Sequence, residues 1–165
     1  MRRNPLRRCI RHAAIIAGLV AATGIAADKE GDVEIQKLNP ADMPKLDYLT
    51  QIVKVKNGKK FLHIAGQTAI NTHFEVVGKT VADQADEALR NLDFALQAGG
   101  AEKRDIVQLN VFFVDSDGQA GKTVTSKMTA YFKGVPPPAI TYLGVPKLVG
   151  DGMLVEIEGQ AVLRK

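Results

Sequence analysis

Apolar side chains recur at helical spacing in two parts of this chain. Across 80–98 they fall three and four residues apart, which predicts an amphipathic helix. Thr80 and Asp83 are typical of a capping box at its start, and Gly99-Gly100 is typical of its end. A second helix is expected over about 119–132, because the proline run at 136–138 excludes helix beyond it.

The remaining apolar pattern indicates strands. Asn57-Gly58 is a strong hairpin turn signal, so we expect the strands on either side of it, 49–55 and 61–67, to pair with each other. A short strand is expected near 74–77, and further strands are expected over 106–114, 139–145 and 153–163.

The order of these elements, β-β-(β)-α-β-α-β-β, predicts an α+β domain of two layers. We expect a mostly antiparallel sheet with two helices on one face. This domain covers 46–165, and residues 27–45 form a polar lead-in with little periodicity. On the last strand Val155 and Ile157 face one way, whereas Glu156, Glu158 and Gln160 face the other. A sheet face of mixed polarity suggests that subunits pack there, with clefts at the edges.

The first 26 residues have the pattern of an export signal. Five arginines without any acid are followed by an apolar run and then by small residues near Ala27. The run is shorter than the roughly 20 residues that span a bilayer, although an uncleaved anchor remains an alternative. We therefore expect an exported, periplasmic protein with no membrane contact after cleavage. The sequence leaves open the exact cleavage site and whether the Sec or the twin-arginine route is used.

Removing this segment changes the charge and the available chemistry. Five of the 22 basic residues lie in it, which leaves 17 basic against 18 acidic residues. The mature domain therefore lacks the basic excess that nucleic-acid binding requires, and it has no Trp for base stacking. Cys9 is the only cysteine and leaves with the signal, so neither a disulfide nor a cysteine nucleophile is expected.

Candidate catalytic groups are few. His63 and His73 have no ligand at metal spacing, and the residues at 115–118 fit a turn with a helix cap better than a calcium loop. We therefore expect no metal site. Glu156 and Glu158 point the same way from one strand, which fits a solvated face and a functional pair equally well.

Several segments taken together resemble the RidA (YjgF) family. His63-Ile64-Ala65-Gly66-Gln67 is similar to the strand of that family that ends in a Gly-Gln pair. Further similar segments follow in the same order and cover the domain from about Tyr48 to Leu163; they are 84–92, 96–101, 105–107, 131–132, 137–139 and 155–161.

The resemblance implies a chorismate-mutase-like fold and a homotrimer whose sheets form a barrel-like assembly. It also implies small-molecule clefts between subunits and hydrolysis of enamines and imines, such as 2-aminoacrylate and 2-iminobutanoate, without a cofactor. In that chemistry an arginine holds the carboxylate of the substrate and a glutamate positions water.

The resemblance carries over unevenly to this chain. Glu156 matches the water-positioning glutamate, Tyr48 matches a cleft tyrosine, and Gly66 and Gln67 match the edge of the cleft. Where the family has its arginine, after Pro138-Ala139, this chain has Ile140. An isoleucine supplies neither charge nor hydrogen-bond donor, so small imino acids are expected to bind poorly.

Two interpretations follow. In the first, the protein is an enamine or imine deaminase with an altered substrate range, in which Ile140 forms an apolar wall. In the second, it is a non-catalytic ligand-binding or holdase-like trimer of the cell envelope. The near-neutral mature charge gives little support to a ribonuclease.

Overall fold

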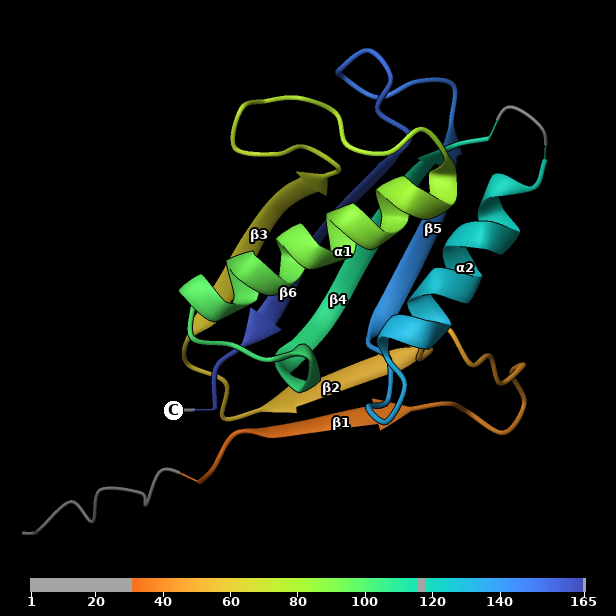
Figure 1. The fold of residues 1–165 in the computed structure, drawn as a ribbon. Helices are drawn as coiled ribbons and strands as arrows, with labels where there is room; N and C mark the ends of the chain where they lie inside the picture. The colour runs from red at the N-terminus through yellow and green to blue at the C-terminus, as the bar shows by residue number, and fades with distance from the viewer. Residues whose placement is uncertain (1–30, 116–117, 165) are drawn as a thin grey trace, which may run out of the picture.

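The computed structural model describes residues 31–115 and 118–164 (Figure 1). The expected export signal, 1–26, lies outside these ranges. Within them, no helix combines the length and the apolar character that crossing a membrane requires.

The elements form a four-stranded sheet, a separate two-stranded ribbon and two α-helices. In the sheet the strand order is β3-β6-β4-β5; β6 is antiparallel to both of its neighbours, and β4 and β5 are parallel. The predicted α+β fold is confirmed. In chain order the elements are β1 (Glu34–Leu38), β2 (Ile52–Lys56), β3 (Phe61–Thr68), α1 (Val81–Ala98), the 3-10 helix η1 (Lys103–Asp105), β4 (Ile106–Val114), α2 (Ala120–Tyr131), β5 (Ala139–Val145) and β6 (Val155–Val162).

Local sequence determines where α1 begins and ends. The Thr80 hydroxyl accepts a hydrogen bond from the Asp83 amide at 3.1 Å, and the Asp83 carboxylate accepts one from the Thr80 amide at 3.3 Å. The helix ends at Gly99, and Gly100 follows with a φ of +73°, a conformation that glycine adopts without strain. The predicted capping box and glycine stop are therefore confirmed.

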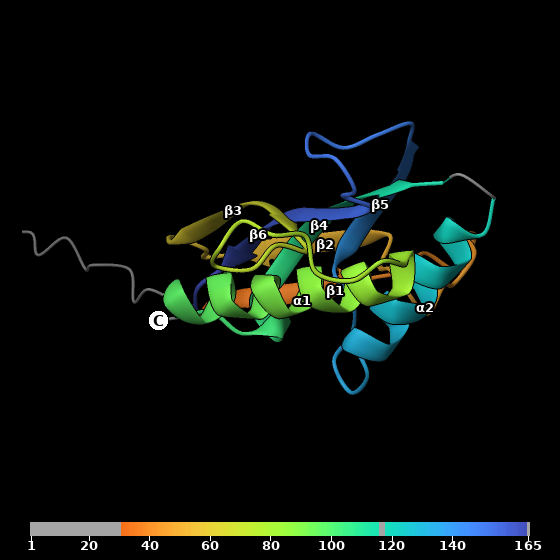
Figure 2. The same cartoon turned by 45° about the horizontal axis from the view of Figure 1, so that its top comes forward.

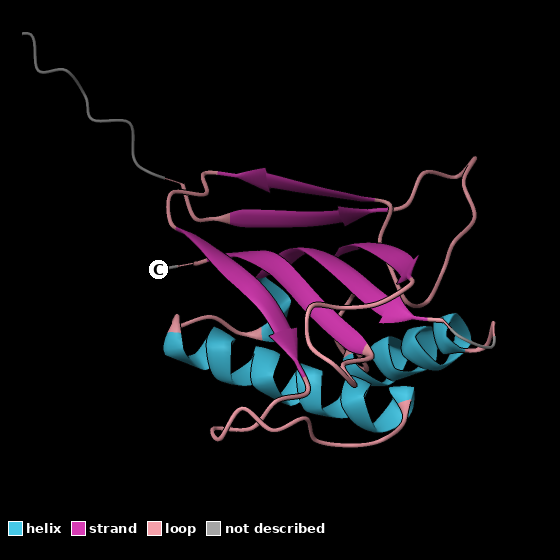
Figure 3. Cartoon of the chain, turned by 90° about the horizontal axis from the view of Figure 1, so that it is seen from above, coloured by secondary structure: helices cyan, strands magenta, loops and turns pink. Residues whose placement is uncertain are grey.

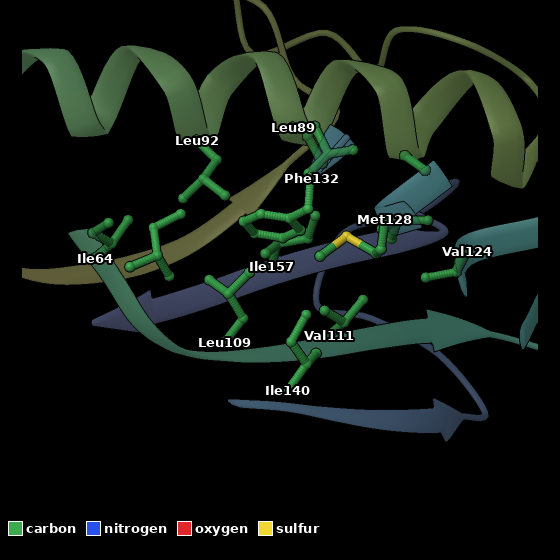
Figure 4. Packing of buried hydrophobic residues seen from close by; sticks show 14 of the residues in the cluster. Ile64, Leu89, Leu92, Leu109, Val111, Val124, Met128, Phe132, Ile140 and Ile157 are labelled. Atoms are coloured by element: carbon green, nitrogen blue, oxygen red, sulfur yellow. The ribbon is translucent and has the colours of Figure 1, made fainter. Parts of the chain in front are cut away.

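Both α-helices cover the same face of the sheet (Figure 2). Their apolar sides meet the inward side chains of the strands in one core, in which Leu92, Leu109 and Ile157 are almost completely buried (Figure 4). The alternation predicted for β6 is confirmed, because Val155 and Ile157 are buried whereas Glu156, on the opposite face, is only partly buried.

The predicted hairpin of the strands at 49–55 and 61–67 is wrong. β2 pairs with β1, whose residues lie in the segment expected to be an irregular lead-in, and β3 pairs with β6. Asn57 does turn the chain, with a φ of 57°, but the turn leads from the ribbon into the sheet. The strand expected near 74–77 is also wrong, since only a single bridge forms there, between Ile70 and Val76.

The β1–β2 ribbon lies on the side of the sheet away from the helices (Figure 3). It is attached where β5 begins. The Thr50 amide donates to the Pro138 carbonyl at 2.8 Å, and the Lys37 ammonium donates to the Pro136 carbonyl. The ribbon therefore covers one end of the sheet and leaves the rest of that face open.

Candidate functional site

Glu156 is the second residue of β6, on the sheet face opposite the helices. It is paired with Phe112 of β4 on one side and with Thr68 of β3 on the other. No residue of 31–115 or 118–164 forms a hydrogen bond with its carboxylate. The partly buried carboxylate can therefore accept hydrogen bonds from water or a ligand.

The side chain of Glu156 crosses β3 directly over Gly66. A Cβ added at Gly66 would lie 2.7 Å from Cδ of Glu156 and 2.9 Å from its Cγ, with Oε1 closer still. Because the pairing of β3 with β6 shifts between Ile64 and Gln67, Gly66 belongs to a bulge in β3. A residue without a side chain at this bulge gives the Glu156 carboxylate the space it occupies.

Glu158, the other carboxylate on this face, has a different environment. Its Oε1 accepts a hydrogen bond from the Asn110 side-chain amide at 2.9 Å. The two glutamates that the strand pattern alone could not distinguish are therefore unequal, since a side chain of β4 holds Glu158 and none holds Glu156 in the described chain.

Gln67 follows Gly66 and pairs with Ile157. Its side-chain amide donates to the Ala65 carbonyl at 3.0 Å, which spans the bulge. The side chain of Gln67 also lines a pocket between β3 and α1.

Tyr48 and Ile140 lie at the opposite edge of the sheet, beside β5. The Tyr48 ring packs edge to face against Tyr142, with centroids 5.6 Å apart, and the Tyr142 hydroxyl donates to the Tyr48 carbonyl at 2.8 Å. Burial raises the pKa of Tyr142 above its usual range, so its hydroxyl remains a donor. The pattern of β5 did not single out Tyr142, because its part in the site depends on contact with a distant loop.

Ile140 packs into the core. It pairs with Leu109 of β4, is 8% exposed, and points toward the helices with the other buried side chains (Figure 4). Within a single chain it belongs to the packing under α2.

One chain therefore carries the predicted site residues in two groups. Gly66 and Glu156 meet near the β3 edge, where Gln67 follows in the same strand but faces α1; Tyr48 and Ile140 lie at the β5 edge, with β6 and β4 between these edges. Within residues 31–115 and 118–164, no three histidine, cysteine or acidic side chains come close enough together to hold a metal ion.

The chain is thus a small α+β domain in which a glutamate without a hydrogen-bond partner in the described residues lies beside a bulge on the open sheet face. Residues 44–163 match the family described as Endoribonuclease L-PSP, which includes the RidA (YjgF) proteins. The chain belongs to this family.

Among the relatives, a RutC family protein of Pyrococcus horikoshii is 31% identical over 113 residues, which are 68% of this chain and 84% of the relative. A protein of Dermatophagoides farinae named 2-iminobutanoate/2-iminopropanoate deaminase is 29% identical over 69% of this chain and 84% of its own length.

Two solved structures are similar to this chain. A Rid family protein of unknown function from Yersinia pestis has a TM-score of 0.72 and 31% identity, covering 78% of this chain and 98% of that one. The YjgF gene product of Escherichia coli has a TM-score of 0.58 and 30% identity, covering 64% and 83%.

Proposed function

We propose that this protein hydrolyses enamines or imines to carbonyl compounds and ammonia, with a substrate range different from that of deaminases that bind small imino acids. The observation that carries the proposal is the Glu156 carboxylate, which lies over Gly66 without a hydrogen-bond partner in the described chain. The name of the Dermatophagoides farinae relative supports the reaction class.

The reaction needs only an oriented water and proton transfers. The Glu156 carboxylate accepts a hydrogen bond from a water molecule and directs its oxygen at the carbon of the C=N bond. A C–O bond forms as the C=N electron pair moves to nitrogen; Glu156 takes one proton from the attacking water, and this proton is passed to the nitrogen. The resulting carbinolamine releases ammonia as the carbonyl forms, so imine and water yield carbonyl compound and ammonia.

Ile140 supports the altered substrate range. By the resemblance of the segment after Pro138-Ala139, it stands where the family has its carboxylate-binding arginine, and its buried side chain offers no donor. A hydrogen bond to a charged group contributes about 1.5–3 kcal/mol, so a small imino acid loses at least that much binding free energy here. We therefore propose substrates with an apolar body and no essential carboxylate.

The division of the site between two sheet edges supports a trimer with clefts between subunits. If the β3 edge of one copy faces the β5 edge of the next, Glu156 and Gly66 of one chain meet Tyr48 and Tyr142 of another. Light scattering tests this proposal, because a monomeric mass contradicts it.

We also propose that residues 1–26 direct export to the periplasm. Cell fractionation combined with N-terminal sequencing of the mature protein is the test. A cytoplasmic protein with an intact N-terminus contradicts the proposal.

Ammonia release tests the reaction itself. Freshly generated imines of apolar aldehydes and 2-aminoacrylate are supplied in parallel to the wild type, Glu156→Gln and Glu158→Gln. We expect Glu156→Gln to lose about 100-fold or more in rate, which is typical of removing an acid–base group. Glu158→Gln is the matched control and retains activity, because Glu158 is held by Asn110. Equal loss in both variants contradicts the role of Glu156.

The buried Ile140 also favours a second candidate, a ligand-binding or holdase-like trimer without catalysis. The same assay separates the two functions. No ammonia above background on any imine, with a trimer retained, rejects the enzyme and leaves the binding protein.

A further inference from the structure

The pocket lined by Gln67 lies between α1 and the loop that joins β3 to α1, two segments that Figure 1 shows side by side. Its volume is about 570 Å³, within the usual range for small-molecule sites. Apart from Gln67, its lining is separate from the site around Glu156. The lining residues that matter here are Gln67, Ile70, Glu87, Arg90, Asn91 and Phe94.

The pocket contains one buried anion and one accessible cation. The Glu87 side chain is 10% exposed and lies 2.5 Å, through Oε1, from Nη2 of Arg90, whose side chain is 61% exposed. Arg90 is the only hydrogen-bond partner of Glu87 in the described chain, so Oε2 of Glu87 is free. The guanidinium likewise keeps further N–H groups for a ligand.

Two amide side chains add further acceptors. Both N–H groups of the Asn91 amide are used, with the carbonyls of Thr68 at 2.8 Å and Ile70 at 2.9 Å. Gln67 donates to Ala65. No donor within 31–115 and 118–164 reaches the side-chain oxygens of Asn91 and Gln67. With Oε2 of Glu87, the three residues that line the pocket carry three oxygen acceptors without a donor in the described chain, as many as the donors of an ammonium group.

An apolar wall completes the pocket. Phe94, on α1, is 58% exposed, which is high for an aromatic ring, and Ile70 lines the pocket with it. An apolar group placed here would cover the Phe94 ring.

We propose that this pocket binds a zwitterionic α-amino acid with an apolar side chain. The ammonium meets Glu87 and the two amide oxygens, the carboxylate meets Arg90, and the side chain covers Phe94. A pure amine or a pure acid contacts only one of the two charged side chains, Glu87 or Arg90. Because that pair is in direct contact, the two ligand charges must also be close together, as they are in an α-amino acid.

Calorimetric titration of the full mature protein with L-leucine tests this site. Three related probes each lack one group: 4-methylpentanoate lacks the ammonium, 3-methylbutylamine lacks the carboxylate, and glycine lacks the side chain. We expect L-leucine to bind and each of the three to bind at least about tenfold more weakly. Absence of L-leucine binding up to about 10 mM overturns the proposal, as does an amine that binds equally tightly.

Variants locate the site. Arg90→Gln should weaken L-leucine binding about tenfold or more. Arg104→Gln is a matched control, because Arg104 has the same 61% exposure and is also paired with a glutamate, but it lies outside this pocket. Equal affinities of these two variants overturn the assignment. Both changes are on the surface, so thermal melts should show folded proteins, whereas Glu87→Gln removes a buried charge and serves as a second test.

The inference does not depend on the deaminase proposal. Glu156→Gln should bind L-leucine with wild-type affinity even where it abolishes ammonia release. A loss of L-leucine binding in Glu156→Gln overturns the separation of the two sites.

Discussion

Replacing Gly66 by alanine should displace the Glu156 side chain while leaving the stability of the fold almost unchanged. The new methyl group would lie 2.7 Å from Cδ and 2.9 Å from Cγ of Glu156, closer than non-bonded carbon atoms can approach. Since these atoms belong to a flexible side chain, the carboxylate rotates away and the sheet remains intact. The substitution therefore moves the proposed catalytic group without deleting it.

The expected effect on stability is small. Gly66 does not have a positive φ, so alanine fits its backbone and stabilises by about 0.4–1 kcal/mol through the unfolded chain. Moving Glu156 to another rotamer costs about the same amount. The free energy of unfolding should thus change by less than about 1 kcal/mol, whereas ammonia release should fall by about 100-fold, as for Glu156→Gln.

Urea unfolding and the ammonia assay, run on the same preparations, measure both quantities. Gly144→Ala is the matched control, because a Cβ at this strand glycine would meet its nearest atom, of Phe113, at 3.7 Å, which is ordinary contact. Wild-type activity in Gly66→Ala would refute the reasoning that the position of Glu156 matters. A loss of several kcal/mol in stability would refute the argument that only a side chain moves.

Two further predictions concern stability. Burial, followed by the nearby Arg164, lowers the pKa of Lys37 from 10.5 to about 8. Below pH 8 the folded protein therefore holds a charged, half-buried ammonium, which costs stability. Between pH 8 and 10.5 only the unfolded chain keeps this proton, so the free energy of unfolding rises with pH. Allowing for solvent screening, we expect the free energy of unfolding of the wild type in urea to be about 1–2 kcal/mol higher at pH 9.5 than at pH 7. Lys37→Met should lack this increase, and an equal increase in both proteins would contradict the assignment to Lys37. Phe74 has a φ of 62° and is 86% exposed, so Phe74→Gly should stabilise by up to about 1 kcal/mol by relieving the left-handed backbone. Phe74→Ala, which keeps the Cβ, should melt like the wild type, and a stabilised alanine variant would assign the effect to the ring.

Local signals in the sequence were reliable where the structure they specify is local. The ends of α1 depend on Thr80, Asp83 and Gly100, all within a few residues of the backbone groups they satisfy, and the structure confirms them. The bounds expected for β4 and β5 are also confirmed, because each strand is a short segment of mainly apolar residues.

The pairing of strands was not readable in the same way. Asn57 correctly indicated a turn, but a turn signal does not choose between neighbouring and distant partners. β3 pairs with β6, almost one hundred residues away, because burying both strands under α1 gains more than closing a local hairpin. The same limit applies to Ile140, since only its register with Leu109 shows that its side chain enters the core.

By itself the sequence determined the family, the α+β class and the helix caps, because these depend on ordered motifs and on short-range hydrogen bonds. Only the tertiary structure showed that Asn110 holds Glu158 and leaves Glu156 without a partner in the described chain. It also separated the site residues between two sheet edges and brought Gln67 together with Glu87 and Arg90 around one pocket. Those relations join residues that are far apart along the chain. They arise from register and packing, which a linear pattern does not encode.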